Sequence, residues 1–135
     1  MGSGHRHEVR VRYGEVDQQG VVFNAHYLAY CDDAVDSWLR SLDGAFEGLG
    51  WDLMLKKATL EWQGSAGTGD VLELRLAVSR WGRTSFDVAF AGRVGVGTVG
   101  ERAVFTATIT YVGVRPGTTE PIPPPAEVRR LLGGR

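Results

Sequence analysis

The feature that most constrains the fold is a switch in the spacing of apolar residues near the middle of the chain. Between residues 24 and 42 these residues recur every three or four positions, as on one face of a helix. Beyond residue 58 they alternate with polar residues, as in half-buried strands. The sequence therefore predicts a helix of about 18 residues followed by a series of strands. The helical stripe consists of Leu28, Cys31, Val35, Trp38, Leu39 and Leu42.

Strand-like alternation is found in five segments. In residues 8–13 it places Val9, Val11 and Tyr13 on one side. The other four segments follow the predicted helix, at 58–62, 71–81, 85–94 and 102–114. Glycine-rich connectors separate these four, and such short connectors favour hairpins between consecutive antiparallel strands.

The order of elements predicts an α+β fold in a single domain over residues 1–135. Asn24 is a suitable N-cap for the helix, and Gly44 a suitable stop. The proline-rich tail suggests one short closing helix. We expect one long central helix wrapped by a curled antiparallel sheet of about five strands. One helix cannot cover both faces of that sheet, so we expect association with a second copy.

Composition narrows the possible partners and location. The formal charge of −1 gives no reason to expect nucleic acid. A single cysteine excludes an internal disulfide and favours a reducing compartment. No apolar stretch approaches a membrane span, and the first residues lack the apolar segment of a secretion signal. A cytoplasmic location without membrane partners is the expectation.

Several motifs suggest functions that their surroundings do not support. "GVGTVG" at 95–100 matches a dinucleotide-binding fingerprint, but a strand follows it where a helix is required, which predicts a hairpin turn. His5 and His7 lack a third ligand nearby, so we expect an exposed pair and no metal site. Cys31 has no base in reach and is predicted to be a core residue. No G-x-S-x-G elbow is present.

A catalytic carboxylate is plausible in "YGEVDQQGVVFNAHY", residues 13–27. The first amides of a helix are unpaired donors at the positive end of its dipole, and they suit an oxyanion that forms when a carbonyl is attacked. Asp17 would supply the nucleophile or general base, and Gly20 would allow a tight turn. The alternative from pattern alone is an aspartate that only stabilises its turn.

Residues 11–34, "VRYGEVDQQGVVFNAHYLAYCDDA", resemble the opening signature of the hotdog-fold acyl-CoA thioesterases of the 4-hydroxybenzoyl-CoA thioesterase type. "GSAGTGDVLEL" is similar to that family's small-residue loop before Gly-Asp, and "RWGRTSFDVAF" is similar to its strand–turn–strand. The "PIPPP" tail also resembles the family pattern. The likeness extends over nearly the whole chain.

The resemblance implies a thioesterase that hydrolyses acyl-CoA without a metal or redox cofactor. It assigns the catalytic carboxylate to Asp17 and the amide that polarises the carbonyl to Asn24. It implies dimers or tetramers with the acyl-CoA cleft between subunits. Some branches use an acid on the helix instead, which here means Asp32 or Asp33, and Glu15 is expected to be structural. The implied substrate-binding residues are Gly20, Val22, Phe23, His26, Tyr27, Arg83, Thr84 and Ser85.

Three alternatives remain at this stage. An acyl-carrier-protein thioesterase would need a basic mouth, which Arg80, Arg83, Lys56 and Lys57 could form. A hotdog dehydratase would need a histidine, for which His26 is the candidate. A non-catalytic acyl-CoA-binding protein would bind without turnover. The acyl group is not defined by the sequence, because each of its four tryptophans can be a pocket or a core residue. These tryptophans are Trp38, Trp51, Trp62 and Trp81.

Overall fold

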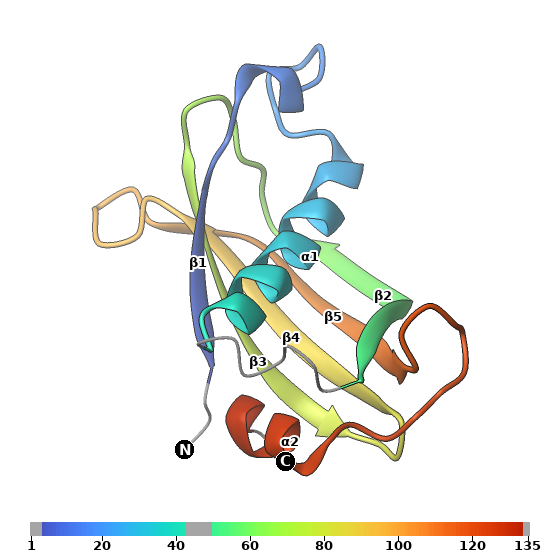
Figure 1. The fold of residues 1–135 in the computed structure, drawn as a ribbon. Helices are drawn as coiled ribbons and strands as arrows, with labels where there is room; N and C mark the ends of the chain where they lie inside the picture. Colours follow the sequence, from blue (N-terminus) through green and yellow to red (C-terminus); the bar gives the residue numbers. More distant parts are fainter. Residues whose placement is uncertain (1–3, 43–49, 134–135) are drawn as a thin grey trace.

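The computed structural model describes residues 4–42 and 50–133, in which helix α1 lies across one face of a twisted antiparallel sheet (Figure 1). The sheet has five strands in the order β1-β3-β4-β5-β2. A short 3₁₀ turn precedes α1, and a second helix, α2, lies beyond the end of β3. The elements are β1 (His5–Arg10), the 3₁₀ turn (Tyr13–Glu15), α1 (Asn24–Arg40), β2 (Asp52–Trp62), β3 (Val71–Trp81), β4 (Ser85–Val94), β5 (Arg102–Val114) and α2 (Ala126–Leu132).

The α+β class and the five-stranded antiparallel sheet are confirmed. The central helix α1 has 17 residues, and α2 is the short closing helix predicted from the proline-rich tail. β3, β4 and β5 have the predicted bounds, and their alternation places one face against α1. The core between α1 and the sheet is built from Tyr27, Cys31, Ala34, Val35, Trp38, Leu72, Leu74, Val88, Phe105 and Ile109.

The connection between β2 and β3 was predicted wrongly as a hairpin. β2 pairs with β5 and is an edge strand, whereas β3 pairs with β1 and β4. The connecting loop crosses under the start of α1, where the Val22 amide donates to the Ala66 carbonyl and Val21 bridges Gly67. Contacts with the helix start, which a local pattern does not reveal, send the chain to the other side of the sheet, where β3 lies between β1 and β4.

The N-terminal strand is displaced from its predicted position. β1 ends at Arg10, and Tyr13 lies in the 3₁₀ turn with 83% of its surface exposed. His5 and His7 are not the exposed pair that was predicted, because both are half-buried in β1 and face α1. His5 stacks on Trp38, and the His7 Nε2 lies 3.2 Å from an Asp33 carboxylate oxygen.

The predicted helix cap is also incorrect. Asn24 is the first helical residue, and the N-cap is Phe23, which makes no side-chain cap hydrogen bond. Its extended backbone, at φ −65° and ψ 136°, leads directly into the helix. The helix ends at Arg40. The predicted stop, Gly44, lies outside the described residues.

Two of the motifs set aside above have the predicted structures. "GVGTVG" is the turn of the β4–β5 hairpin, with Gly95 and Gly97 at positive φ. Cys31 is fully buried, and this burial raises the pKa of its thiol to about 12, so it is a core residue. In the described part of the chain, no helix has the length and apolar character needed to cross a membrane.

Candidate active site

The turn that carries Asp17 is held by a dense set of backbone hydrogen bonds. The Asp17 amide donates to the Val21 carbonyl at 2.9 Å, and Gly20 donates back to the Asp17 carbonyl at 3.0 Å. Val16 and Val22 form an antiparallel bridge across the base of the turn. Gly20 has φ +79°, a conformation that favours glycine, as predicted from its position. The turn is therefore a fixed structure on the surface.

Asp17 is exposed at the tip of this turn. One carboxylate oxygen, Oδ1, accepts the Gln19 amide at 2.8 Å, which is the Asx-type bond expected of a turn aspartate. Among residues 4–42 and 50–133, no donor is bonded to its other oxygen, Oδ2. The same residue thus stabilises its turn and presents a carboxylate oxygen to a ligand.

Helix α1 begins seven positions after Asp17, and its first amides are available. In the described chain, the amides of Asn24 and Ala25 donate to no backbone carbonyl, whereas the His26 amide donates to the Phe23 carbonyl. Asn24 and Phe23 are both exposed. The first turn of α1 therefore offers two free N–H groups at the positive end of the helix dipole.

Some of the predicted substrate-binding residues of this region lie on the surface, and others are buried and support the start of the helix. Val22 and Tyr27 are buried, with exposures of 2% and 1%. The Tyr27 hydroxyl accepts the Ala66 amide at 3.1 Å, so both residues fasten the helix start to the β2–β3 loop. Gly20 and Phe23 lie on the surface of the turn, and His26 is half-buried.

Glu15 has a larger role than its sequence position indicated. Its carboxylate accepts the Arg12 amide, the Arg12 guanidinium and the Tyr30 hydroxyl, at 2.9, 3.0 and 2.9 Å. Burial alone would raise the pKa of Glu15, but these hydrogen bonds outweigh it and lower the pKa. Burial, and then the bond to Glu15, raise the pKa of Tyr30, which keeps its hydroxyl a donor. The Glu15 carboxylate caps the Arg12 amide as in a capping box, but Arg12 is not the Ser or Thr by which that motif is recognised in a sequence.

The helix acids lie on opposite sides of α1. Asp32 accepts the hydroxyl of the buried Tyr111 at 3.0 Å, and Asp33 pairs with His7. Within residues 4–42 and 50–133, neither forms a salt bridge with an arginine. Within the described ranges, no group of three His, Cys, Asp or Glu residues is arranged to hold a metal ion.

Arg83, Thr84 and Ser85 lie at the other end of the sheet from Asp17. The Asp17 turn follows β1, whose last residue, Arg10, pairs with Val71 at the start of β3. The Arg83 turn follows Trp81 at the end of β3, and ten residues of strand span roughly 33 Å. One chain therefore does not bring the predicted catalytic and phosphate-contact residues together. The Arg129 guanidinium fastens α2 to this second turn, donating to the Gly82 carbonyl and lying over the Trp81 ring.

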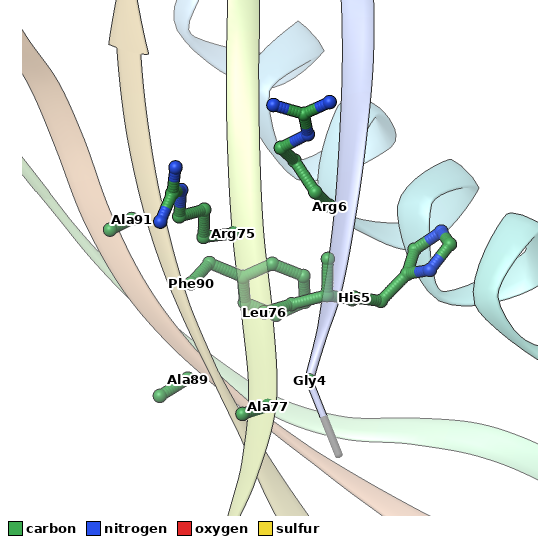
Figure 2. Close-up of a pocket in the computed structure, with 9 residues that line it drawn as sticks. All are labelled: Gly4, His5, Arg6, Arg75, Leu76, Ala77, Ala89, Phe90 and Ala91. Carbon is green, nitrogen blue, oxygen red and sulfur yellow. The ribbon is translucent and has the colours of Figure 1, made fainter. Parts of the chain in front are cut away.

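A cavity of about 630 Å³ lies away from both turns, beside β1, β3 and β4 (Figure 2). Ala89 and Ala91 point away from α1 there, whereas His5 points toward it. Arg6 and Arg75 line the cavity, and both bind the buried Glu73 carboxylate, which is not among its lining residues. The cavity therefore presents no carboxylate for thioester attack.

Several solved structures with this fold are thioesterases. The chain has a TM-score of 0.87 and 16% identity to 4-hydroxybenzoyl-CoA thioesterase, solved as mutant D17N complexed with 4-hydroxybenzoyl-CoA, over 97% of this chain and 99% of that one. For a 1,4-dihydroxy-2-naphthoyl-CoA thioesterase from Synechocystis the TM-score is 0.79, with 20% identity over 96% and 95%. For a gentisyl-coenzyme A thioesterase it is 0.79, with 19% identity over 95% and 98%. At these identities the similarity establishes the fold.

The family itself is established by sequence. Residues 11–132 match the model of the thioesterase-like superfamily, and the chain belongs to it. The predicted resemblance to hotdog thioesterases is therefore confirmed, and with it membership of a family of thioester hydrolases. No curated protein matched the chain in the comparison.

Proposed function

We propose that the protein hydrolyses acyl-CoA thioesters to the free acid and CoA, with Asp17 as nucleophile or general base. The observation that carries the proposal is the exposed Asp17 carboxylate on a fixed turn, directly before a helix whose first amides are free. A carboxylate can attack a carbonyl without a base to activate it. The family match and the fold are consistent with this assignment.

The chemistry needs two groups, and the turn provides both. Asp17 attacks the thioester carbonyl, or removes a proton from the water that attacks it, and the carbonyl oxygen becomes an oxyanion. The Asn24 amide donates to that oxyanion. Collapse of the tetrahedral species breaks the C–S bond and releases the CoA thiolate. If Asp17 is the nucleophile, water then cleaves the resulting anhydride and restores the carboxylate.

We further propose that the working site lies between two copies of the chain. Arg83 has a guanidinium suited to CoA phosphates, but it lies roughly 33 Å of strand from the Asp17 end. A two-fold partner could place its own Arg83 turn beside Asp17. β2 is an edge strand, and it exposes Met54, Leu55 and Trp62. Exposed apolar side chains on a free edge are suited to pairing with a second copy.

A carrier-protein thioester is the second candidate, because several cations are open to an acidic partner. Lys56, Lys57 and Arg83 are exposed, and in the described chain none forms a salt bridge. Arg80 is less suitable than predicted, because it is paired with Asp87. Matched CoA and carrier-protein thioesters of one acyl group would separate the candidates. If kcat/KM is at least tenfold higher with the carrier-protein thioester than with the CoA thioester, the substrate is the carrier-protein thioester.

The proposed activity is tested by a hydrolysis screen over short-chain, long-chain and aryl CoA thioesters, with Asp17→Asn as the inactive control. Turnover of at least one class by the wild type, and its loss in the variant, is the expected result. Binding of a CoA thioester without turnover by the wild type would favour a non-catalytic acyl-CoA-binding protein.

A further inference from the structure

The Glu15 carboxylate connects the catalytic turn to the second turn of α1. It accepts hydrogen bonds from the Tyr30 hydroxyl in the helix and from the amide and the guanidinium of Arg12. Only 13% of the Glu15 side chain is exposed. Its main chain is part of the same connection, because the Glu15 carbonyl accepts the Phe23 amide at 3.0 Å. Glu15 therefore holds both ends of the segment that contains Asp17.

This connection fixes the relation between the two proposed catalytic groups. Asp17 follows Glu15 by two residues, and Asn24 follows Phe23 directly. Any shift of Glu15 therefore changes the position of the Asp17 turn relative to the first residues of α1. Nucleophile and oxyanion donor must be placed to within a fraction of an ångström, and a displacement of about 1 Å can reduce the rate about 10²-fold.

We propose that Glu15, held by Tyr30 and Arg12, is the positioning residue that aligns Asp17 with the first amides of α1. This inference rests on the proposed function, since it assigns Glu15 a role in the same reaction. Glu15 does not touch the substrate. Its effect passes through the geometry of Asp17, so its removal lowers kcat and leaves substrate affinity almost unchanged.

The surroundings of Glu15 make this role testable without collapse of the core. Glu15 and Tyr30 line a cavity of about 440 Å³ together with Arg12, His26 and Asp33. Side-chain changes at this site therefore face open space on one side. Glu15→Gln preserves the shape but turns an N–H₂ group toward the Arg12 guanidinium, which also donates. Tyr30→Phe removes one hydrogen bond and keeps the ring.

Glu73 provides a matched control. It is also a buried carboxylate held by two donors, Arg6 at 3.2 Å and Arg75 at 2.9 Å, and 4% of its side chain is exposed. It lies in β3, and in the described structure its side chain hydrogen-bonds to Arg6 and Arg75 and not to the Asp17 turn. Glu73→Gln therefore removes an equivalent buried charge and measures the cost of that loss to folding alone.

The test compares steady-state kinetics, melting temperature and affinity for a non-hydrolysable CoA thioester analogue in these variants. We expect Glu15→Gln to lower kcat about tenfold or more, and Tyr30→Phe several-fold, both with KM within about twofold. Glu73→Gln should lower the melting temperature without a comparable loss of kcat. The proposal would be overturned if Glu15→Gln changed kcat and melting temperature only as Glu73→Gln does. It would also be overturned if Glu15→Gln changed KM alone.

Non-additivity distinguishes this inference from the proposed function. In an Asp17→Asn background, followed with enzyme in excess, Glu15→Gln should cause no further loss, because the residue it positions no longer reacts. A further loss of the same size as in the wild type would mean that Glu15 acts independently of Asp17. If Asp17→Asn alone retains full turnover, the proposed mechanism fails, whatever Glu15 does.

Discussion

The two ends of the sheet differ in chemistry, because one carries the proposed catalytic groups and the other carries the proposed phosphate contact. At the end where β3 begins, the Asp17 turn provides an exposed carboxylate and free helix amides. At the end where β3 finishes, α2 lies close by (Figure 1) and is fastened to the Arg83 turn by Arg129. The exposed Arg83 provides a guanidinium group there. One end is suited to attack a carbonyl and the other to hold phosphate. Under the proposed function, we expect a complete site to combine the two ends from different chains.

The largest effect on turnover is expected from removing the negative charge of Asp17. Asp17→Asn preserves size and the Asx bond to Gln19, so the turn should persist. We expect kcat to fall by about 10² or more, with melting temperature and analogue affinity nearly unchanged. Near-wild-type turnover on a good substrate would show that Asp17 is only a turn residue.

The helix amide can be removed separately. Proline is tolerated at the first position of a helix, and Phe23 already has the extended backbone that precedes proline. Asn24→Pro should therefore keep the fold, delete one N–H group and lower kcat about 10²- to 10³-fold.

Asn24→Ala is the control for this substitution, since it keeps the amide. Asn24 is the first helical residue and not the N-cap, so stability should change by no more than about 0.5 kcal/mol. Equal losses of kcat in Asn24→Pro and Asn24→Ala would assign any effect to the side chain and contradict the oxyanion role. Rates and thermal melts of both variants decide the question.

A change at the Arg83 end should affect binding and leave the chemical step intact. We expect Arg83→Ala to raise KM for a CoA ester by roughly tenfold at low ionic strength, and by less as salt screens the contact. kcat should remain unchanged. An unchanged KM at low salt would remove Arg83 from the site.

The smallest expected effect is that of a chelator. Asp17 and the helix amides can supply nucleophile and oxyanion donors without a metal, so EDTA should leave kcat within experimental error. Loss of activity that one divalent ion restores would show that a metal participates.

Local patterns were sufficient for much of the sheet. β3, β4 and β5 were predicted with their observed bounds, because alternation and β-branched residues report burial on one face. The position of β2 was missed because it depends on tertiary contacts. The bonds of Val22 to Ala66 and of Val21 to Gly67 direct the loop across the sheet, and no periodicity records them.

The site was predicted less completely, for a similar reason. Asp17 and the helix start were identifiable because they are close in sequence and carry a motif. The Tyr30–Glu15 bond joins a helical residue to the turn, and the helical pattern gave Tyr30 no distinguishing feature. The separation of Arg83 from Asp17 depends on strand register, which only the structure provides.

Mixing two defective variants tests most directly whether both ends form one site across chains. Asp17→Asn and Arg83→Ala chains should be unfolded together, refolded and assayed at low substrate, with sedimentation to establish the oligomer. In a hybrid dimer, one site then combines an intact Asp17 with an intact Arg83. Random pairing should restore about a quarter of wild-type sites, so activity should rise clearly above the mean of the two variants. Activity equal to that mean, or a 14.7 kDa species alone in sedimentation, would contradict a shared site.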